Sequence, residues 1–407
     1  MKRNLNSKEK LLVFIKRTKK KNSRYIMFLL PIIIVILIGS TWFERTQSVK
    51  KVKLSKGSEL TMTMVGDIMM GRYVNSVVEQ HGTEYVFRYV SPYFKNSDYV
   101  SGNFDQPVLL KEEKEYKKAD EQMGLHTNEN VVKMMKEQGF TLFNLANTNM
   151  MDYGKAGLTD TLKTLKKEKI NAVGAGKNLE SAKHIAYQEI NGIRVATVGF
   201  TDAYSKKSNA TDKRAGVLTM DPDLLFELIG KAKDPSQGNA DLVVVNASWG
   251  QEYDSEPSPR QEKLGRAMID AGADIIIGHH PHVLQSVEVY KQGIIFYSLG
   301  NFVFDQGWTK TKDSALVQYN LGANGQAKIE IVPLIIKEGT PRPAASWLDK
   351  RRIYQELTKY TPSNVLVDKK QDKFEILINH KHVLEHKENR NNAKNDAEVE
   401  AKEGKAA

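Results

Sequence analysis

The chain has 407 residues, no cysteine and a formal net charge of +11, with 40% hydrophobic and 27% charged residues. This balance is typical of a globular protein and excludes a disordered or fibrous chain, and the length allows one large α/β domain or two to three smaller ones. Without cysteine there is no disulfide framework, no thiolate zinc site and no cysteine nucleophile. Any bound metal must therefore be held by His, Asp, Glu or Asn.

The positive charge is concentrated at the N-terminus. Residues 1–24 contain ten Lys or Arg and one acid, Glu9, which makes a net charge of +9. The last residues, 385–407, carry −1, so only +3 remains for everything between. A nearly neutral central region gives no support to nucleic-acid binding, and the basic segment is expected to contact anionic lipid instead.

An uncharged segment follows the basic one. Tyr25–Phe43 is nineteen residues long, and as a helix it spans about 28 Å, close to the hydrocarbon thickness of a bilayer. A cleaved signal peptide is the alternative, but its apolar core is usually shorter, and Gly39–Thr41 before Trp42 is a poor cleavage site. We expect an uncleaved signal anchor in the cell membrane, with residues 1–24 in the cytoplasm and 44–407 outside the cell.

The rest of the chain divides into three parts by composition. Residues 44–58 are polar and unpatterned, which predicts a stalk. Residues 385–407 are charged and lack aromatics, which predicts a disordered tail. Residues 59–384 alternate between strand-like and helix-like patterns. This alternation predicts an α/β domain built on a sheet, or on two stacked sheets flanked by helices.

Local signals locate several of these elements. Asn128 can cap a helix that Gly139 ends, and Pro259–Ala271 has an amphipathic helical pattern. Asn191-Gly192 between two apolar runs predicts a hairpin with a type I′ turn. Further β-rich sequence covers 283–321 and 327–336. Strands are expected over 60–65, 99–101, 141–146, 241–247 and 274–277.

Polar residues collect where the expected strands end, which is where α/β sheets bind ligands. They include Asp67, Asp105, Asn147, Asn149, Ser248, His279, His280 and His282. One carboxylate after a strand is commonly a cap or a turn former, but three histidines within four residues are harder to explain in this way. Converging Asp, Asn and His side chains would suit a divalent metal such as Mn, Zn or Fe, which can polarise a phosphoryl oxygen. The alternative is that these side chains only hydrogen-bond one another.

Five longer motifs together resemble the CapA/PgsA family, membrane-anchored bacterial proteins needed for poly-γ-glutamate capsule synthesis and export. The motifs are GDIMMGR, DYVSGNFD, NLANTNMMDYG, DAGADIIIGHHPHVLQ and IIFYSLGNFVFDQGW. The outer domain of this family is similar to calcineurin-like metallophosphoesterases. The resemblance therefore implies a four-layer α/β/β/α sandwich with a metal site at the strand ends.

The resemblance also assigns roles to single residues. Asp67 matches the first metal ligand, and Asp105 stands at the bridging-acid position, where the family usually has Glu. The other implied ligands are Asn147, His280 and His282. Asn149 and His279, beside these ligands, are the candidates for a catalytic role.

Two positions depart from the family pattern. Asn149 and Ser248 stand where histidines are expected. Asn149 cannot transfer a proton at neutral pH, and Ser248 is a poor ligand for a transition metal. One metal is compatible with the remaining ligands, whereas the departures count against a two-metal hydrolase.

Three functions follow from these expectations. The first is an anchored subunit of a poly-γ-glutamate synthesis and export complex, whose outer domain handles or releases the polymer. No G-x-x-x-x-G-K-[ST] motif occurs, so chain elongation would belong to a separate cytoplasmic ATP-dependent ligase, with small membrane subunits as further partners. A basic groove with Arg72, Lys155 and Arg260 could contact γ-glutamyl carboxylates. The other two are an extracellular metal-dependent hydrolase of a phosphoester or γ-glutamyl bond, and a structural adaptor.

Overall fold

A computed structural model describes residues 7–46, 57–119, 123–203, 207–360, 367–369 and 373–403. The chain divides into two compact units, Met1–Lys51 and Val52–Ala407. In the first unit, α1 (Ser7–Thr46) is a 40-residue helix that contains Pro31 and includes the uncharged segment. Within the described residues, no helix combines the length and the apolar character needed to cross a membrane. The predicted stalk over 44–58 lies mostly outside the described residues.

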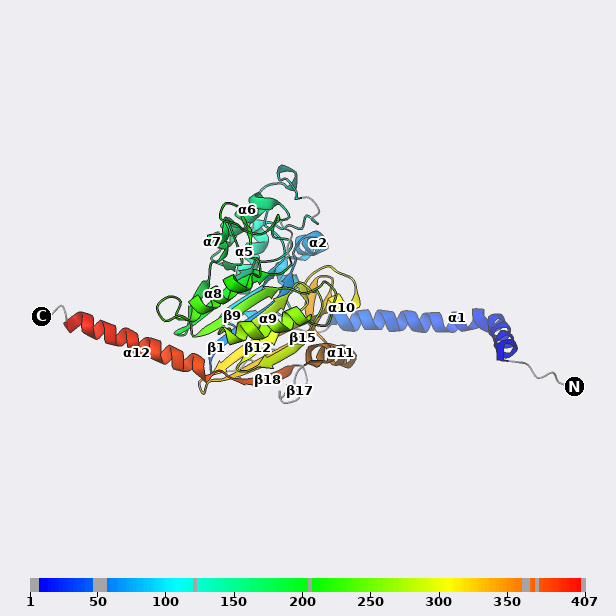
Figure 1. Ribbon diagram of the computed structural model, residues 1–407. Coiled ribbons are helices and arrows are strands. Elements are labelled where there is room, and N and C mark those ends of the chain that lie inside the picture. The colour runs from blue at the N-terminus through cyan, green and yellow to red at the C-terminus, as the bar shows by residue number, and fades with distance from the viewer. Residues whose placement is uncertain are drawn as a thin grey trace. The chain divides into compact units, whose positions relative to one another are not determined.

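The second unit is built on two large sheets (Figure 1). The first sheet has ten strands. β1, β2, β3 and β4 follow one another in parallel, and β14 lies antiparallel on the other side of β1. Its strands are β1 (Ser58–Ile68), β2 (Tyr99–Phe104), β3 (Leu142–Asn144), β4 (Asn171–Val173), β13 (Asn301–Val303), β14 (Asp313–Gly322), β15 (Gln326–Lys337), β16 (Thr340–Pro343), β17 (Val367–Lys369) and β18 (Phe374–Asn379).

The second sheet has six strands in the order β11-β12-β10-β9-β7-β6. These are β6 (Ala186–Ile190), β7 (Ile193–Thr201), β9 (Leu242–Ser248), β10 (Ile275–His279), β11 (Val287–Tyr290) and β12 (Gly293–Phe296). A small separate pair joins β5 (Ala175–Gly176) to β8 (Gly216–Val217). The helices of this unit are α2 (Arg72–His81), α3 (Thr83–Phe87), α4 (Ser91–Phe94), α5 (Glu129–Gln138), α6 (Gly154–Lys167), α7 (Leu179–Ala182), α8 (Pro222–Lys233), α9 (Pro259–Asp270), α10 (Thr309–Lys312), α11 (Trp347–Thr358) and α12 (Lys381–Glu403).

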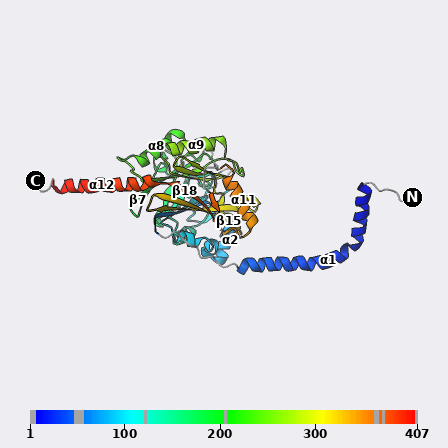
Figure 2. The same ribbon diagram turned by 90° about the horizontal axis from the view of Figure 1, so that it is seen from below.

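Side chains alternate across both sheets and thereby create four layers. In β9, Leu242 and Val244 face the core between the sheets, while Val243 and Val245 face α8 and α9. The outer face of the first sheet packs against α2 to α6 in a third core. Figure 2 shows α8 and α9 on one side of the strands and α2 on the other. Because both faces of each sheet are buried, central strands such as β9 and β10 are apolar over most of their length.

The local signals correspond to the observed elements. Asn128 Oδ1 accepts hydrogen bonds from the backbone N–H groups of Asn130 and Val131, and α5 ends at Gly139, whose φ is +108°. The helix expected over Pro259–Ala271 is α9 (Pro259–Asp270), and the structure adds a Ser258 capping box at its start. Asn191 and Gly192 have φ values of +50° and +77° between β6 and β7, as a type I′ turn requires. These predictions are confirmed.

The structure differs from the sequence expectation at the C-terminus. The stretch expected to be a disordered tail, 385–407, is helical as far as Glu403, and 404–407 lie outside the described residues. Arg390 is buried, and its Nη2 lies 2.7 Å from Asp241 Oδ2 and donates to the Gly192 carbonyl. Composition misled here because pairing with a buried carboxylate stabilises a charge that composition alone counts as solvent-exposed.

Candidate functional site

The carboxyl ends of strands from both sheets meet at one edge of the domain. Asp67 is near the end of β1, and His279 is the last residue of β10 in the other sheet. Asp67 Oδ1 lies 3.6 Å from His279 Nδ1, so the two sheets bring their polar ends into contact. The other predicted residues at this edge are Asp105 after β2, Asn147 and Asn149 after β3, Ser248 at the end of β9, and His280 and His282 after β10.

Gly66 allows β1 to approach the turn before β13. The N–H of Asp67 donates to the Gly300 carbonyl at 3.0 Å, and a Cβ on Gly66 would lie 1.9 Å from that oxygen. Any other residue at position 66 would therefore move the strand end. Position 66 is therefore glycine for a steric reason, because only a residue without a Cβ lets Asp67 lie against the 300–301 turn.

Asp67 is fully buried and lies between two histidines. Its Oδ1 accepts a hydrogen bond from Asn103 Nδ2 at 2.8 Å, and its Oδ2 lies 3.2 Å from His282 Nδ1. Burial alone would raise the pKa of Asp67, but His282, His279 and Asn103 together hold it below the usual value. The carboxylate is therefore charged at neutral pH.

The pKa values of the two histidines are shifted in opposite directions, although the charge of Asp67 acts to raise both. Burial acts to lower the pKa of His282, but its contact with Asp67 and the charges of Asp67 and Asp105 raise it to about 9. Burial lowers the pKa of His279 to about 4, against the charge of Asp67. One imidazolium and one neutral imidazole therefore face the same carboxylate.

His280 does not join this contact. Its ring centroid lies 6.1 Å from that of His282, and among the described residues it forms no ion pair with a carboxylate. His280 and His282 have φ values of +92° and +58°, which are strained for residues with a Cβ. Such backbone strain is concentrated at functional sites. The structure thus places His279 and His282 at Asp67, where the resemblance implied His280 and His282.

Asp105 supplies a second carboxyl group. Its N–H donates to the Ile68 carbonyl at 3.0 Å, which holds the residue beside the end of β1. Burial and the negative charge of Asp67 raise the pKa of Asp105 to about 7, although its contact with Asn149 lowers it. Asp105 can therefore gain or lose a proton near neutral pH.

Asn147 acts on the cluster through another amide. Its Nδ2 donates to Asn103 Oδ1 at 3.1 Å and to the Phe104 carbonyl at 2.9 Å, and Asn144 Nδ2 also donates to Asn103 Oδ1. Asn103 in turn donates to Asp67. Asn147 is therefore a positioning residue in this structure rather than a direct neighbour of the carboxylate.

Sequence reasoning assigned no role to three asparagines of the site. Besides Asn103, Asn246 Oδ1 lies 3.2 Å from His279 Nε2 and Asn301 Oδ1 lies 2.9 Å from His282 Nδ1. All three stand at strand ends or starts beside the predicted residues. Their position at strand ends, beside the predicted residues, was the sequence feature that could have identified them.

Buried polar atoms that lack a hydrogen-bond partner show whether the residues of the cluster could bind a metal ion. Asp67 Oδ2, His279 Nδ1 and Ser248 Oγ are buried without a hydrogen-bond partner among the described residues. When His279 Nε2–H donates to Asn246, the Nδ1 lone pair faces the Asp67 carboxylate, and a cation would satisfy both. In the described part of the chain, however, no three His, Asp or Glu side chains are grouped to hold a metal. The donor types fit a divalent cation, but a complete ligand set is not assembled.

The expected basic groove is largely neutralised. Arg72 pairs with Asp305, and Arg260 forms two hydrogen bonds to Asp202, at 2.6 and 3.0 Å. Lys155 is an exposed residue of α6. Two of the three predicted cations are thus committed to carboxylates of the same chain.

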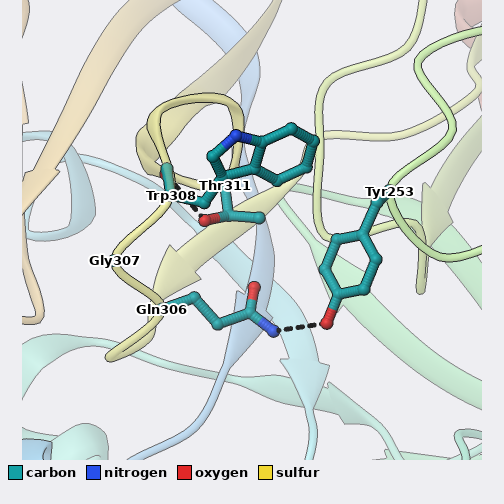
Figure 3. A pocket seen from close by; sticks show the side chains of 5 residues that line it. All are labelled: Tyr253, Gln306, Gly307, Trp308 and Thr311. Carbon is teal, nitrogen blue, oxygen red and sulfur yellow. Dashed lines mark hydrogen bonds between the residues drawn. The ribbon is translucent and has the colours of Figure 1, made fainter.

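A pocket of about 380 Å³ opens beside the cluster (Figure 3). Its lining consists of Tyr253, Gln306, Gly307, Trp308 and Thr311. Gln306 Nε2 donates to the Tyr253 hydroxyl at 3.2 Å, and Gln306 Oε1 accepts from Asn301 Nδ2 at 2.9 Å. Because Asn301 also contacts His282, the pocket is joined to the cluster through one amide.

Comparisons with solved structures give only distant similarities. The chain matches a sulfate thiohydrolase SoxB of Thermus thermophilus with 14% identity and a TM-score of 0.37, covering 72% of this chain and 47% of that one. It matches the calcineurin-like phosphoesterase YfkN of Bacillus subtilis with 14% identity and a TM-score of 0.34, covering 82% and 97%. At these TM-scores the description of the fold rests on the chain's own sheets and cores.

Comparisons with sequences give close relatives. The chain is 61% identical to "Capsule biosynthesis protein CapA" of Bacillus anthracis over 95% of this chain and 94% of the relative. It is 48% identical to "PGA biosynthesis protein CapA" of Bacillus subtilis (strain 168) over 88% and 93%. The family model described as "Bacterial capsule synthesis protein PGA_cap" matches residues 61–306, which include the whole Asp67 cluster but not Gly307, Trp308 and Thr311 of the pocket. The chain therefore belongs to the PGA_cap family of bacterial capsule synthesis proteins.

Proposed function

We propose that this chain is a subunit of the machinery that makes and exports a poly-γ-glutamate capsule, and that the unit Val52–Ala407 handles the polymer. The observation that carries this proposal is the 61% identity to a capsule biosynthesis protein over 95% of the chain. A relative that matches almost end to end supports the same role for the whole chain, not only for the folded domain.

The chemistry of the site favours handling over synthesis. No phosphate-binding G-x-x-x-x-G-K-[ST] motif occurs in the sequence, so the ATP-dependent ligation belongs to a separate cytoplasmic partner. Asn149 and Ser248 replace the proton-transferring and metal-binding histidines expected of a hydrolase. An open pocket beside a buried cluster suits the binding of a chain that another subunit has made.

The N-terminal unit would fix this domain to the cell membrane. Tyr25–Phe43 carries no charge, residues 1–24 are strongly basic, and α1 is helical over the uncharged segment. The positive-inside rule then places the basic segment in the cytoplasm and the domain outside the cell. This location would bring the domain to the point where an exported polymer emerges.

A deletion strain tests the proposed role. Loss of the gene should remove surface poly-γ-glutamate, measured by acid hydrolysis of washed capsule material, and the full chain expressed in trans should restore it. A strain that lacks the gene and keeps a normal capsule would contradict the proposal.

A metal-dependent hydrolase acting on a phosphoester or a γ-glutamyl bond is the second candidate. The buried His279 Nδ1, which has no hydrogen-bond partner among the described residues and lies 3.6 Å from Asp67 Oδ1, favours it. Asp67 and His279 would hold the metal, with Asp105 and His282 beside them, and the metal would supply Lewis-acid polarisation of the scissile group. The full chain should then retain a divalent metal through dialysis and turn over an aryl phosphate. Asp67→Ala should lose both properties, whereas Asp212→Ala, at an exposed site, should keep them. If wild type and Asp67→Ala have the same metal content and rate, this candidate fails.

A further inference from the structure

The pocket beside the cluster has two exposed aromatic walls. The exposed fractions of Tyr253 and Trp308 are 42% and 51%. Their ring centroids lie 5.9 Å apart at 74°, so the two rings are in edge-to-face contact and form one aromatic surface. Ligand sites are typically lined by aromatic side chains with a few placed polar groups, and 380 Å³ is in their size range. Figure 3 shows the Trp308 ring above the neighbouring Tyr253 ring, with the Gln306 amide below and directed at the Tyr253 hydroxyl.

Backbone contacts hold both walls in place before any ligand binds. The Tyr253 N–H donates to the Pro281 carbonyl at 2.8 Å, and Tyr253 has a φ of +63°. Thr311 Oγ1 donates to the Trp308 carbonyl at 2.8 Å. A bulky residue in the left-handed region is costly, and such strain is concentrated at binding sites. The pocket is therefore preorganised.

One cation stands beside the pocket. Lys310 lies between the lining residues Trp308 and Thr311, and its Nζ donates to Ser255 Oγ at 3.0 Å. Its charge interacts with Glu256 and Asp313, but those carboxylates are paired with Lys359 and Arg352, and Lys310 itself forms no ion pair with a described carboxylate. A ligand with a single carboxylate at this point matches the available charge, whereas a dense polyphosphate would require more free cations.

We propose that this pocket binds the amide and methylene backbone of a γ-linked glutamate chain against the exposed faces of Tyr253 and Trp308, with one α-carboxylate facing Lys310. A γ-linked unit carries two methylenes and a flat amide between successive carboxylates, and both groups pack well on aromatic rings. The inference rests on the proposed function and adds to it a location and a binding mode for the polymer.

Calorimetric titration tests the assignment. The full-length chain in mild detergent is titrated with a γ-linked glutamate oligomer, and with an α-linked oligomer of the same length for comparison. Trp308→Ala should weaken binding of the γ-linked oligomer roughly tenfold or more. Lys310→Gln should weaken it several-fold and reduce its salt dependence.

Trp347→Ala is the matched control, because Trp347 is 66% exposed and lies on α11, outside the pocket lining. It should bind like wild type, and all variants should have the wild-type unfolding temperature. Equal affinities of Trp308→Ala and Trp347→Ala would overturn the assignment, and so would equal binding of the α-linked oligomer.

The inference and the proposed function fail in different ways. If the deletion strain loses its capsule and the full chain restores it, but the purified chain does not bind the γ-linked oligomer, only the pocket assignment is overturned. If the deletion strain keeps its capsule, the proposed function fails whatever the titration shows.

Discussion

At the scale of single residues, Asp67 determines the charge of the whole cluster. The pKa of its own carboxyl group is held below the usual value, and its charge helps to raise the pKa of His282 to about 9 and that of Asp105 to about 7. At neutral pH the cluster then holds a charged carboxylate, an imidazolium and a partly protonated acid. These charges compensate one another in a site with almost no solvent, which limits the desolvation cost.

Gly66 provides a residue-scale prediction. Gly66→Ala should lower the free energy of unfolding by about 1–3 kcal/mol or more, because the new methyl group cannot fit against the Gly300 carbonyl. Chemical denaturation of the two proteins measures the difference. Gly230→Ala on α8 is the control, since a Cβ there meets nothing within 4 Å, and it should leave stability unchanged or raise it by up to about 1 kcal/mol. Equal stabilities of the two variants would contradict the steric argument.

At the scale of elements, α12 is attached to the second sheet through two buried carboxylates, Asp274 and Asp241. His382 Nε2 lies 2.7 Å from Asp274 Oδ1, and Lys233 Nζ of α8 lies 2.9 Å from Oδ2 of the same carboxylate. Further along α12, Arg390 pairs with Asp241. Asp241 and Asp274 immediately precede β9 and β10, so the helix is held at the strand ends opposite the cluster.

The Asp274 contacts predict a pH dependence. Burial raises the pKa of Asp274, but Lys233, His382 and His380 outweigh it and hold the pKa well below the usual value. A carboxyl group whose pKa is depressed on folding contributes stability above its unfolded pKa, about 3.9, and loses it as the pH falls further. Wild type should therefore be more stable than Asp274→Asn at pH 7, and the gap in unfolding temperature should narrow below about pH 4. Asp212→Asn, an exposed control, should follow the wild-type profile, and a gap independent of pH would contradict the argument.

Truncation tests where the domain ends. A chain that stops after Leu384 removes Arg390 and leaves Asp241 buried with its charge unpaired, so it should lose about 3–5 kcal/mol of stability. A chain that stops after Ala393 keeps the pair and should unfold like the full chain. Arg390→Met removes the charge without shortening the helix and should be destabilised as well. If the chain ending at Leu384 is as stable as the full chain, the contacts of α12 do not stabilise the domain.

At the scale of the whole molecule, the four layers explain where the site lies. Parallel strands place their carboxyl ends at one edge of each sheet, and packing the two sheets face to face brings both edges together. The cluster takes Asp67 and Asp105 from strand ends of the first sheet and its histidines from the end of β10 in the second. Neither sheet alone carries the site.

The proposed topology can be tested with single cysteines, because the chain contains none. Lys8→Cys lies in the basic segment, and Lys213→Cys lies at an exposed position of the domain. In intact cells a membrane-impermeant maleimide should label Lys213→Cys, whereas Lys8→Cys should react only after lysis. Equal labelling of both variants in intact cells would contradict an N-terminus in the cytoplasm.

Much of the fold could be predicted from local sequence. The Asn128 cap, the Ser258 capping box and the Asn191-Gly192 turn depend on residues within a few positions of one another, so they are readable without any tertiary contact. The strand-end positions of Asp67 and His279 were readable in the same way. The motifs were also long enough to indicate the family, which the comparisons confirm.

Only the tertiary structure decided which of these residues meet. It placed His279 rather than His280 at Asp67, because the left-handed backbone of the 280–282 turn directs neighbouring side chains differently. It joined Tyr253 to Trp308 across 55 positions of sequence to form the pocket, and it buried Arg390 against Asp241. Local patterns specify strands, turns and caps because their hydrogen bonds are local. Pairings between distant residues depend on how whole sheets and helices pack, and no local pattern encodes that packing.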